Sequence, residues 1–385
     1  MITTKTAFTT EIDDVDAAVR SLLEQLDIEH SLLAHSVGVL TCFRDFISGG
    51  VVKALSDALP FDVVGCGCIG SGCQGAAGEM QLVLTVFSSD DVVFSTGVSE
   101  SLSGGGNPFT DAYTKALAGL PDPPKLILFY SPHLSGIGND KTLGLFSEAA
   151  PGVPIFGTIS SSFEFQTDKY STPVVFNGEV YDDNAGFIVL SGNVRPDFYV
   201  TALAPQNPQK SKAVITKTNG TRVLEINNKS PVLWLRDVGI DDDSFATLAS
   251  FPVIVDYRDG TAPVPRAFLV APNGELISSL YIHEGVGISL GEMNDKDVMT
   301  TSTALVREIA ANSKGKSFVL MHSCLSRLFV LGVDTTAEME MIRSHMAGTV
   351  PFHFCYSGGE ICPIRKEGGE EINRLHNFSF AACAL

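Results

Sequence analysis

Two stretches of the sequence run through the same succession of apolar and polar segments, and this repetition constrains the fold more than any other feature. Each begins with an apolar run that ends at a serine-containing polar cluster, KLILFYSPHLS at 125–135 and KSFVLMHSCLS at 316–326. An amphipathic segment, a second apolar run ending in small residues, and a closing apolar run follow in both. These segments are 141–150, 152–162 and 185–192 in one stretch, and 337–347, 349–359 and 378–385 in the other. The succession predicts a strand, a helix, a strand with a turn, and a final strand.

A third copy of the pattern lies near the N-terminus. Its first run, helical segment, second run and closing run are residues 36–43, 45–59, 61–72 and 80–87. A further helix is predicted before each copy, at residues 15–26, 108–120 and 297–311. The predicted unit is therefore α-β-α-β-turn-β, three times. Because strand–helix–strand successions are common in α/β proteins, chance similarity is the alternative, above all for the N-terminal copy.

The region between the second and third copies has a different character. It consists of short β-rich runs that are broken by Pro, Asn and Gly. We expect an α/β protein (mixed α+β), in which the repeated units form mixed sheets covered by helices. The expected divisions are an α/β region at 1–195, a β-rich middle section at 196–296 and a second α/β region at 297–385.

Composition excludes several classes of protein. The 26 Lys and Arg residues against 44 Asp and Glu residues give a formal net charge of −18, which disfavours binding to nucleic acid or to an anionic membrane. The 44% hydrophobic content and a mean hydropathy of +0.19 argue against disorder. No run approaches the length of a membrane span, and the first residues lack the apolar core of a signal peptide.

Eight cysteines in a chain of 385 residues do not make a disulfide framework. Reduced thiols in a cytoplasmic protein are the simplest interpretation. Three of them, Cys66, Cys68 and Cys73, could ligate zinc or an iron–sulfur cluster, or they could be small buried residues beside glycine. The same segment, Gly65–Gly70, has the G-x-G-x-x-G spacing of a dinucleotide-binding turn. It is followed by a strand pattern rather than a helix, so we favour a turn between strands.

Polar side chains collect at the predicted strand ends, where ligands bind in open α/β sheets. His322 and Cys324 lie at the end of the first strand of the third copy, and Arg327 follows them. The thiol and imidazole could form a Cys–His nucleophile, although no third orienting group can be named. Alternatively, the Arg327 guanidinium could bind a carboxylate in a bidentate manner or form an ion pair between elements.

The second strand of each copy ends in a turn with further candidates. Tyr356 and Glu360 lie on a glycine-hinged turn and could orient a small polar ligand or satisfy local backbone amides. The equivalent turn of the second copy carries Ser160 and Ser161. His376 and Asn377 precede the last strand, where the imidazole could be structural or could ligate a metal or haem.

These motifs resemble the FIST domain family. The segments GVPIFGTISSSFEF at 152–165 and VVFNGEVYDDNAGFIVLSG at 174–192 resemble the FIST N domain, with Asn177–Tyr181 matching its F-x-N-G-x-V-Y segment. The turn at Thr158–Ser161 departs from the small Gly/Ala and Asp residues common there. Ser323–Arg327, Tyr356–Pro363 and His376-Asn377 resemble strand-end, G-G-E-I and H-N motifs of the FIST C domain. The resemblance covers roughly residues 30–385.

The resemblance implies an intracellular sensory module that binds a small ligand such as an amino acid. FIST domains occur fused to kinases, chemoreceptors and cyclic-dinucleotide enzymes, and no output domain is expected after the last strand here. This chain is therefore expected to signal through a separate protein such as a kinase. The ligand identity and the oligomeric state stay open.

The predicted site is a cleft where the repeated turns converge. Arg327 would bind a carboxylate, and Tyr356, Glu360 and Asn377 would orient polar groups, the glutamate taking an ammonium group. Cys324, His376, Ser160 and Ser161 complete the expected ligand-binding set. No catalytic residue, metal or cofactor is expected.

Two alternatives come from other functional classes. Some FIST proteins bind haem and sense nitric oxide, which implies a gas sensor with His376, His322 or His353 as the axial ligand. A hydrolase or transferase with a Cys324 nucleophile is the enzymatic alternative.

Overall fold

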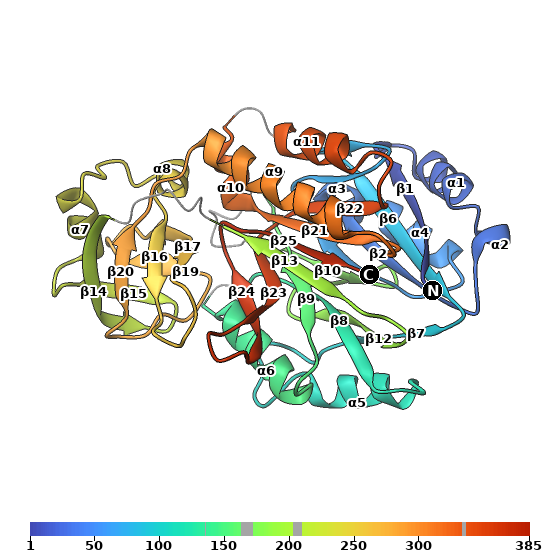
Figure 1. Cartoon of the computed structure of the whole chain (residues 1–385), viewed down its shortest axis with the longest axis horizontal. Coiled ribbons are helices and arrows are strands. Elements are labelled where there is room, and N and C mark those ends of the chain that lie inside the picture. The colour runs from blue at the N-terminus through green and yellow to red at the C-terminus, as the bar shows by residue number, and fades with distance from the viewer. Residues whose placement is uncertain (135, 163–171, 203–209, 333–335) are drawn as a thin grey trace.

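The computed structural model contains three α/β units and a separate β-rich domain that is inserted into the third unit (Figure 1). It describes residues 1–134, 136–162, 172–202, 210–332 and 336–385. Phe163–Phe165 of the FIST N-like segment lie outside the described residues. The mixed α/β fold class is confirmed.

The first unit contains β1 (Thr3–Thr9), α1 (Val15–Leu26), α2 (Ile28–Ser31), β2 (His35–Cys42), α3 (Arg44–Ser48), α4 (Val51–Ala58), β3 (Val63–Gly67), β4 (Ser71–Cys73), β5 (Ala77–Gly78) and β6 (Leu82–Ser89). The second contains β7 (Val92–Val98), α5 (Thr110–Ala118), β8 (Pro124–Ser131), α6 (Asn139–Ala149), β9 (Ile155–Ile159), β10 (Val174–Phe176), β11 (Glu179–Tyr181) and β12 (Gly186–Gly192). The third contains β13 (Asp197–Thr201), α9 (Asp295–Asn312), β21 (Val319–Cys324), α10 (Leu325–Val330), α11 (Ala337–Met346), β22 (Phe352–Ser357), β23 (Gly359–Arg365), β24 (Glu371–His376) and β25 (Phe380–Ala384).

The three units share one sheet topology, which confirms the repeat. The strand orders are β1-β6-β2-β3, β7-β12-β8-β9 and β13-β25-β21-β22. In each unit the last two strands of that order are parallel, and the other pairs are antiparallel. Each unit therefore begins with a strand that pairs with its own closing strand.

The units also exchange hairpins in a closed cycle. The β10–β11 hairpin of the second unit extends the first sheet beside β3, and the β23–β24 hairpin of the third unit extends the second sheet beside β9. The short β4–β5 hairpin of the first unit completes the cycle by pairing with β22. Each sheet is thus built from two units, and no unit can complete its sheet alone.

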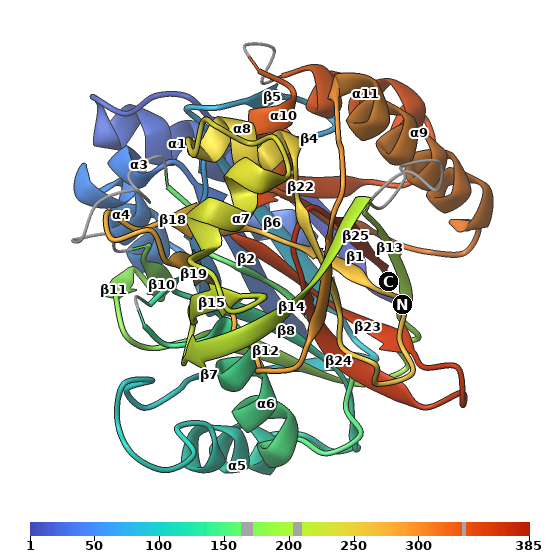
Figure 2. The same ribbon diagram turned by 90° about the vertical axis from the view of Figure 1, so that its left-hand side faces the viewer.

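The alternation of side chains along the strands creates two kinds of core. Val39, Leu128 and Leu320 point to a central core shared by the three sheets, together with their neighbours on the same strand faces. Leu40 and Phe129, one residue further along, point outward to the helices of their own unit. Figure 2 shows the resulting arrangement, with three groups of helices at three corners around the strands.

Helix α1 matches its predicted bounds, and Asp14 caps its first turn by accepting a hydrogen bond from the Ala17 amide. The helix expected at 45–59 is instead two helices, α3 and α4, because Gly49-Gly50 interrupts it and Gly50 has a φ of 85°.

The segment Gly65–Gly70 forms the end of β3 and the connection to β4, so no helix follows it. Gly65 is required by close approach, since a Cβ there would lie 1.9 Å from the Leu40 carbonyl oxygen of the parallel neighbour. This supports the turn between strands over the dinucleotide-binding interpretation.

The inserted domain has its own sheet and its own core. Its elements are β14 (Lys210–Asn219), β15 (Arg222–Ile226), α7 (Pro231–Asp237), α8 (Phe245–Ser250), β16 (Val253–Asp256), β17 (Val264–Arg266), β18 (Phe268–Val270), β19 (Leu276–Ser278) and β20 (Gly287–Leu290). Seven strands pair in the order β17-β16-β20-β14-β15-β19-β18, and Trp234 lies in the core beside them. Asp197–Thr201 were expected to belong to this middle section, but they form β13 and pair with β25 of the third unit.

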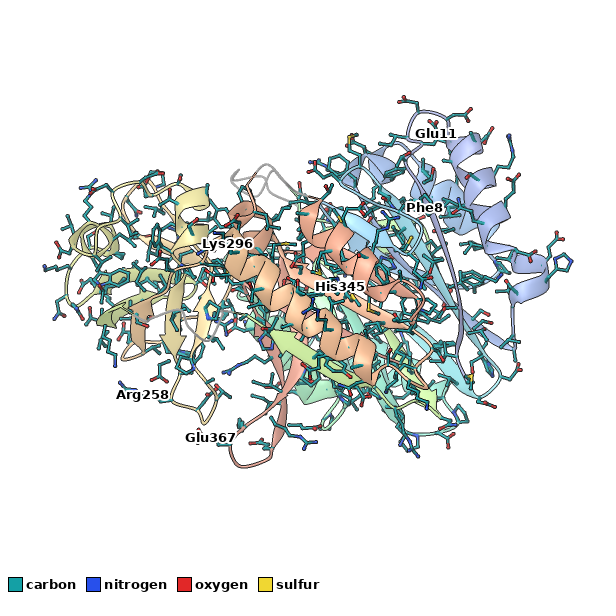
Figure 3. All side chains as sticks on the ribbon, turned by 45° about the horizontal axis from the view of Figure 1, so that its top comes forward. Phe8, Glu11, Arg258, Lys296, His345 and Glu367 are labelled. Atoms are coloured by element: carbon teal, nitrogen blue, oxygen red, sulfur yellow. The ribbon has the colours of Figure 1, made fainter. Side chains whose placement is uncertain are left out.

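The middle domain touches the rest of the molecule at one end. Its 257–263 loop meets the tip of the β23–β24 hairpin, where the Glu367 amide donates to the Gly260 carbonyl at 3.1 Å. Figure 3 shows Arg258 and Glu367 at this contact. Across the described residues, no helix is both long and apolar enough to cross a membrane.

Candidate ligand site between the units and the middle domain

A cavity of about 100 Å³ lies where the carboxyl ends of β9, β21 and β22 meet the middle domain. Strands from two different units supply its floor, and β18, β19 and α8 supply the opposite wall. The lining residues are His133, Ser160, Phe245, Ala267, Phe268, Leu269, Ile277, Ser278, Ser279, Cys324, Leu325, Ser326, Gly358 and Asn377. The wall is largely apolar with a few polar groups, as in many small-molecule sites.

Three of the predicted site residues, Ser160, Cys324 and Asn377, come together in this cavity although they are far apart in sequence. Asn377 has an exposed fraction of 2%, and its Oδ1 has no hydrogen-bond partner among the described residues. A buried amide oxygen without a partner is costly, because it gives up water without compensation. The Asn377 amide oxygen is therefore a group on the cavity wall that a hydrogen-bond donor of a ligand would satisfy.

An unusual turn between β24 and β25 presents Asn377. Phe378 adopts a left-handed backbone with a φ of 56°, which is rare for a large side chain. The backbone on both sides is fixed, since the Cys324 amide donates to the Ser379 carbonyl at 2.8 Å and Arg327 Nη1 donates to the Phe378 carbonyl at 3.5 Å. Such strain persists only where the surroundings enforce it, and it is concentrated at functional sites.

Glu360 is fully buried behind the same turn. Its Oε2 accepts a hydrogen bond from Ser379 Oγ at 2.5 Å, and its Oε1 has no hydrogen-bond partner in the described residues. Burial raises the pKa of Glu360 to about 8, so the carboxyl group is mostly protonated at neutral pH. In that form it offers a hydrogen-bond donor rather than a negative charge.

Cys324 is a poor nucleophile in this setting. Burial, with a smaller contribution from Glu360, raises the pKa of its thiol to about 12. A catalytic cysteine needs the opposite shift, because the thiolate is the reactive form. The structure therefore gives the predicted Cys–His arrangement no activated thiol.

Ser160 and Ser161 join the units to one another. Ser160 Oγ donates to the Gly67 carbonyl of the first unit at 2.8 Å, and Ser161 Oγ donates to the Tyr356 carbonyl of the third unit at 2.9 Å. Both hydroxyl protons are used in these contacts. Ser160 can still accept a hydrogen bond from a ligand in the cavity.

Arg327 faces a protein carboxylate rather than the cavity. Its Nη2 lies 3.1 Å from Glu338 Oε1, and both side chains are fully buried. The same nitrogen donates to the Val298 carbonyl at 3.1 Å and to Thr301 Oγ1 at 3.2 Å on α9. The guanidinium thus ties α10 to α9 and α11, and a ligand carboxylate would have to displace Glu338 to reach it.

Tyr356 and His376 also lie away from the cavity wall. The Tyr356 ring packs in the core beneath α11, in edge-to-face contact with Phe354 at 5.1 Å. His376 Nε2 contacts the Cys362 carbonyl at 3.2 Å across the β23–β24 hairpin. Burial lowers the pKa of His376 to about 3, so its ring is neutral.

Two family models match the chain, the FIST N domain over residues 36–229 and the FIST C domain over residues 232–363. The chain belongs to the FIST family. FIST domains are sensory domains, which supports a signal-input role for this chain. The cavity is built from both matched regions, with Ser160 from the FIST N part and Cys324 from the FIST C part.

Three solved structures are distant likenesses to this FIST protein. The cyanuric acid hydrolase from A. caulinodans aligns with 100% of this chain and 99% of its own, at 12% identity and a TM-score of 0.37. A second cyanuric acid hydrolase structure gives 10% identity, the same coverage and a TM-score of 0.36. PurL from T. maritima aligns over 71% of its chain at 11% identity and a TM-score of 0.21. Scores this low establish neither a common fold nor a common activity. Among curated proteins, none has a significantly similar sequence.

The histidines that were considered as haem ligands are committed to internal contacts. His353 contacts Thr41 Oγ1 at 2.6 Å and Thr85 Oγ1 at 3.1 Å. His322 Nδ1 contacts Cys355 Sγ at 3.1 Å, and the ring stacks on Phe156 with centroids 5.0 Å apart. Both rings are buried, and His322 Nε2 has no hydrogen-bond partner among the described residues.

The described residues contain no group of three or more His, Cys, Asp or Glu side chains placed to hold a metal ion. Cys66, Cys68 and Cys73 are buried free thiols, and burial raises the pKa of each. This agrees with the interpretation of small buried residues beside glycine.

Several lining residues escaped the sequence analysis. His133 follows β8 as Cys324 ends β21, and burial lowers its pKa to about 4. The matched segments KLILFYSPHLS and KSFVLMHSCLS could have identified it, because equivalent strand ends meet at one edge. The lining residues of the middle domain, such as Phe268 and Ser279, lie outside the repeated units, so no matched segment could have identified them.

Proposed function

We propose that this FIST protein is a signal-input protein that binds a small polar ligand in the cavity beside Asn377. The observation that carries the proposal is the unpartnered Asn377 Oδ1, buried on the cavity wall and presented by a strained turn. A ligand N–H or O–H group would satisfy it. The neighbouring Ser160 oxygen supplies a second acceptor.

The ligand we propose is a small amino acid. The cavity volume of about 100 Å³ corresponds to roughly three water molecules, so only the smallest members of that class fit without movement of the middle domain. An ammonium group matches the acceptor oxygens of Asn377 and Ser160. The Ser326 hydroxyl lines the same wall and is suited to a carboxylate, a role the sequence analysis gave to Arg327.

We further propose that the protein acts in the cytoplasm and passes its signal to a separate protein such as a kinase. All eight cysteines are free and buried, which suits a reducing compartment. The sensory role of the family supports an output partner. A net charge of −18 suits a partner with a basic surface rather than a nucleic acid.

A thermal-shift screen of the purified protein against the amino acids, followed by calorimetry, tests the proposal. We expect glycine, alanine or serine to raise the Tm, since a ligand that binds only the folded state stabilises it. Asn377→Ala should abolish that shift. The substitution should leave the ligand-free Tm nearly unchanged, because Oδ1 has no protein partner to lose.

Asn312→Ala is the matched control, at an exposed position near the end of α9. It should bind like the unmodified protein. If no amino acid binds, or if one binds equally well to Asn377→Ala, the proposed ligand site is wrong.

A further inference from the structure

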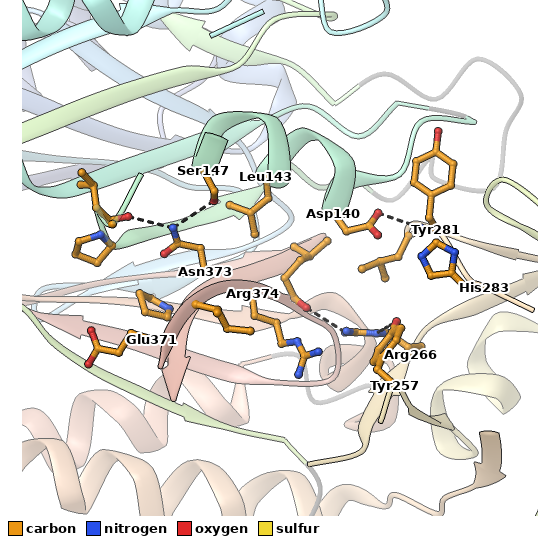
Figure 4. A pocket seen from close by; sticks show the side chains of 18 residues that line it. Asp140, Leu143, Ser147, Tyr257, Arg266, Tyr281, His283, Glu371, Asn373 and Arg374 are labelled. Atoms are coloured by element: carbon orange, nitrogen blue, oxygen red, sulfur yellow. Dashed lines mark hydrogen bonds between the residues drawn. The ribbon is translucent and has the colours of Figure 1, made fainter. Parts of the chain in front are cut away.

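A second and larger cavity, of about 480 Å³, lies between α6, β24 and the middle domain (Figure 4). Its volume falls within the range of ordinary ligand pockets. It shares no lining residue with the cavity beside Asn377. Whatever it binds is therefore a separate question from the proposed amino-acid site.

Arg266 lines this cavity as a buried charged side chain without an ion-pair partner among the described residues. Only 3% of it is exposed, yet no carboxylate of the described residues forms an ion pair with it. Its Nη1 donates to the Leu375 carbonyl at 3.1 Å, and its Nε donates to the Tyr257 hydroxyl at 3.1 Å. Neutral acceptors hold the guanidinium in place. Asp140, which also lines the cavity, interacts with it electrostatically but forms no ion pair with it, so the buried charge is only partly offset.

The neighbouring Arg374, in contrast to Arg266, has a carboxylate partner. Arg374 Nη2 lies 2.7 Å from Asp259 Oδ2. Both guanidinium groups lie over the ring of Tyr257, with 5.4 Å from each Cζ to the ring centroid. Asp259 pairs with one of these two guanidinium groups, and Glu371, which also lines the cavity, pairs with Arg365, so Arg266 is left without an ion-pair partner on this wall.

The opposite wall limits the charge and shape of an occupant. Asp140 on α6 lines the cavity, and its Oδ1 accepts a hydrogen bond from the Tyr281 amide at 3.0 Å. A carboxylate there disfavours a multiply charged anion such as phosphate. Leu143 and Leu280 supply apolar surface between the two walls, which suits an organic body.

We propose that this cavity binds a small monovalent organic anion, a carboxylate with an apolar or aromatic body, and that Arg266 is its counter-ion. The carboxylate lies against the Arg266 guanidinium. The body lies along the α6 wall and Leu280. The proposal goes beyond the amino-acid site and stands or falls separately from it.

Benzoate and indole-3-acetate, each beside its neutral amide, are the probes. Calorimetry with the full chain should show that the acids bind about ten- to hundredfold more tightly than the amides, since only the acids pair with the buried charge. Arg266→Gln should remove that preference. Equal binding of acid and amide, or no binding of either acid at millimolar concentration, overturns the proposal.

Gly144 gives a test that does not depend on removing a buried arginine. Asp140, Leu143, Gly144 and Ser147 line the cavity at helical spacing, so one face of α6 points into it. A Cβ on Gly144 meets no atom within 4 Å. Gly144→Leu should therefore fill the cavity and abolish acid binding, while Gly144→Ala, the matched control, should bind nearly as the unmodified protein does.

Both Gly144 variants should fold, because each gains helix propensity over glycine. Unchanged acid binding by Gly144→Leu would place the acid elsewhere and refute the site. Asn377→Ala should leave acid binding intact, which separates failure of this proposal from failure of the amino-acid site.

Discussion

The buried carboxyl group of Glu360 should make the stability of the protein fall as the pH rises through neutrality. The perturbation is Glu360→Gln, which keeps the shape and a hydrogen-bonding group for Ser379 but removes the titration. The side chain is fully buried, and burial raises its pKa from the ordinary value of 4.5 to about 8. Below pH 4.5 it is protonated in the folded and the unfolded chain, so it contributes no pH dependence there.

Between the two pKa values the folded chain holds a proton that the unfolded chain has lost. The free energy of unfolding must therefore decrease as the pH rises through this window. The shift of 8 − 4.5 = 3.5 units corresponds to a loss of about 5 kcal/mol at 1.36 kcal/mol per unit, an order-of-magnitude figure. Above pH 8 the full penalty of the buried charge is present.

Urea denaturation between pH 5 and pH 9 measures the effect, with the exposed substitution Glu367→Gln as control. The unmodified protein and Glu367→Gln should lose stability relative to Glu360→Gln as the pH rises. The difference should level off above pH 8. Parallel pH profiles for all three proteins would refute the assignment of a raised pKa to Glu360.

Three further predictions concern packing and reactivity. Glu338→Leu should lower the free energy of unfolding by about 3–5 kcal/mol, because it leaves the buried Arg327 charge unpaired. Adding Arg327→Leu should recover part of that loss in urea denaturation. Strictly additive losses would contradict a direct ion pair. Native Cys324 should react with iodoacetamide far more slowly than free cysteine at neutral pH, as followed by mass spectrometry, because burial raises its thiol pKa; rapid labelling would indicate an activated thiolate. Gly65→Ala should cost about 1–3 kcal/mol or more by denaturation, since its Cβ would lie 1.9 Å from a carbonyl oxygen, whereas Gly144→Ala should cost nothing.

The repeated pattern predicted the central strands of each unit and the helices between them, because apolar periodicity reports which faces are buried, but it did not predict the opening strands β1 and β7. It could not predict that β13 joins the third sheet, since Asp197–Thr201 is a short run whose partner, β25, follows the whole inserted domain. The exchange of hairpins between units could not be predicted from the sequence either. The sequence of β10 records a strand but not which unit it extends.

The candidate site was predictable in part for the same reason. Strand-end logic brought Ser160, Cys324 and Asn377 to one edge, although it could not tell a cavity wall from a helix-facing core. Arg327 illustrates the limit. A guanidinium at a strand end predicts a carboxylate partner, but only the packing of α11 shows that the carboxylate belongs to Glu338.

Both cavities lie at the interface between the three units and the middle domain (the seam), and this placement has a thermodynamic consequence. A ligand that touches both sides of the seam binds the docked arrangement more tightly than an undocked one, so it must favour docking. At a concentration one hundred times its Kd, such a ligand stabilises the form it binds by about 2.7 kcal/mol. Since Arg374 and Asp259 also cross this seam, a ligand in either cavity would add to an existing contact rather than create one. The middle domain is inserted between β13 and α9. Its position relative to the three units is thus what a bound ligand would change.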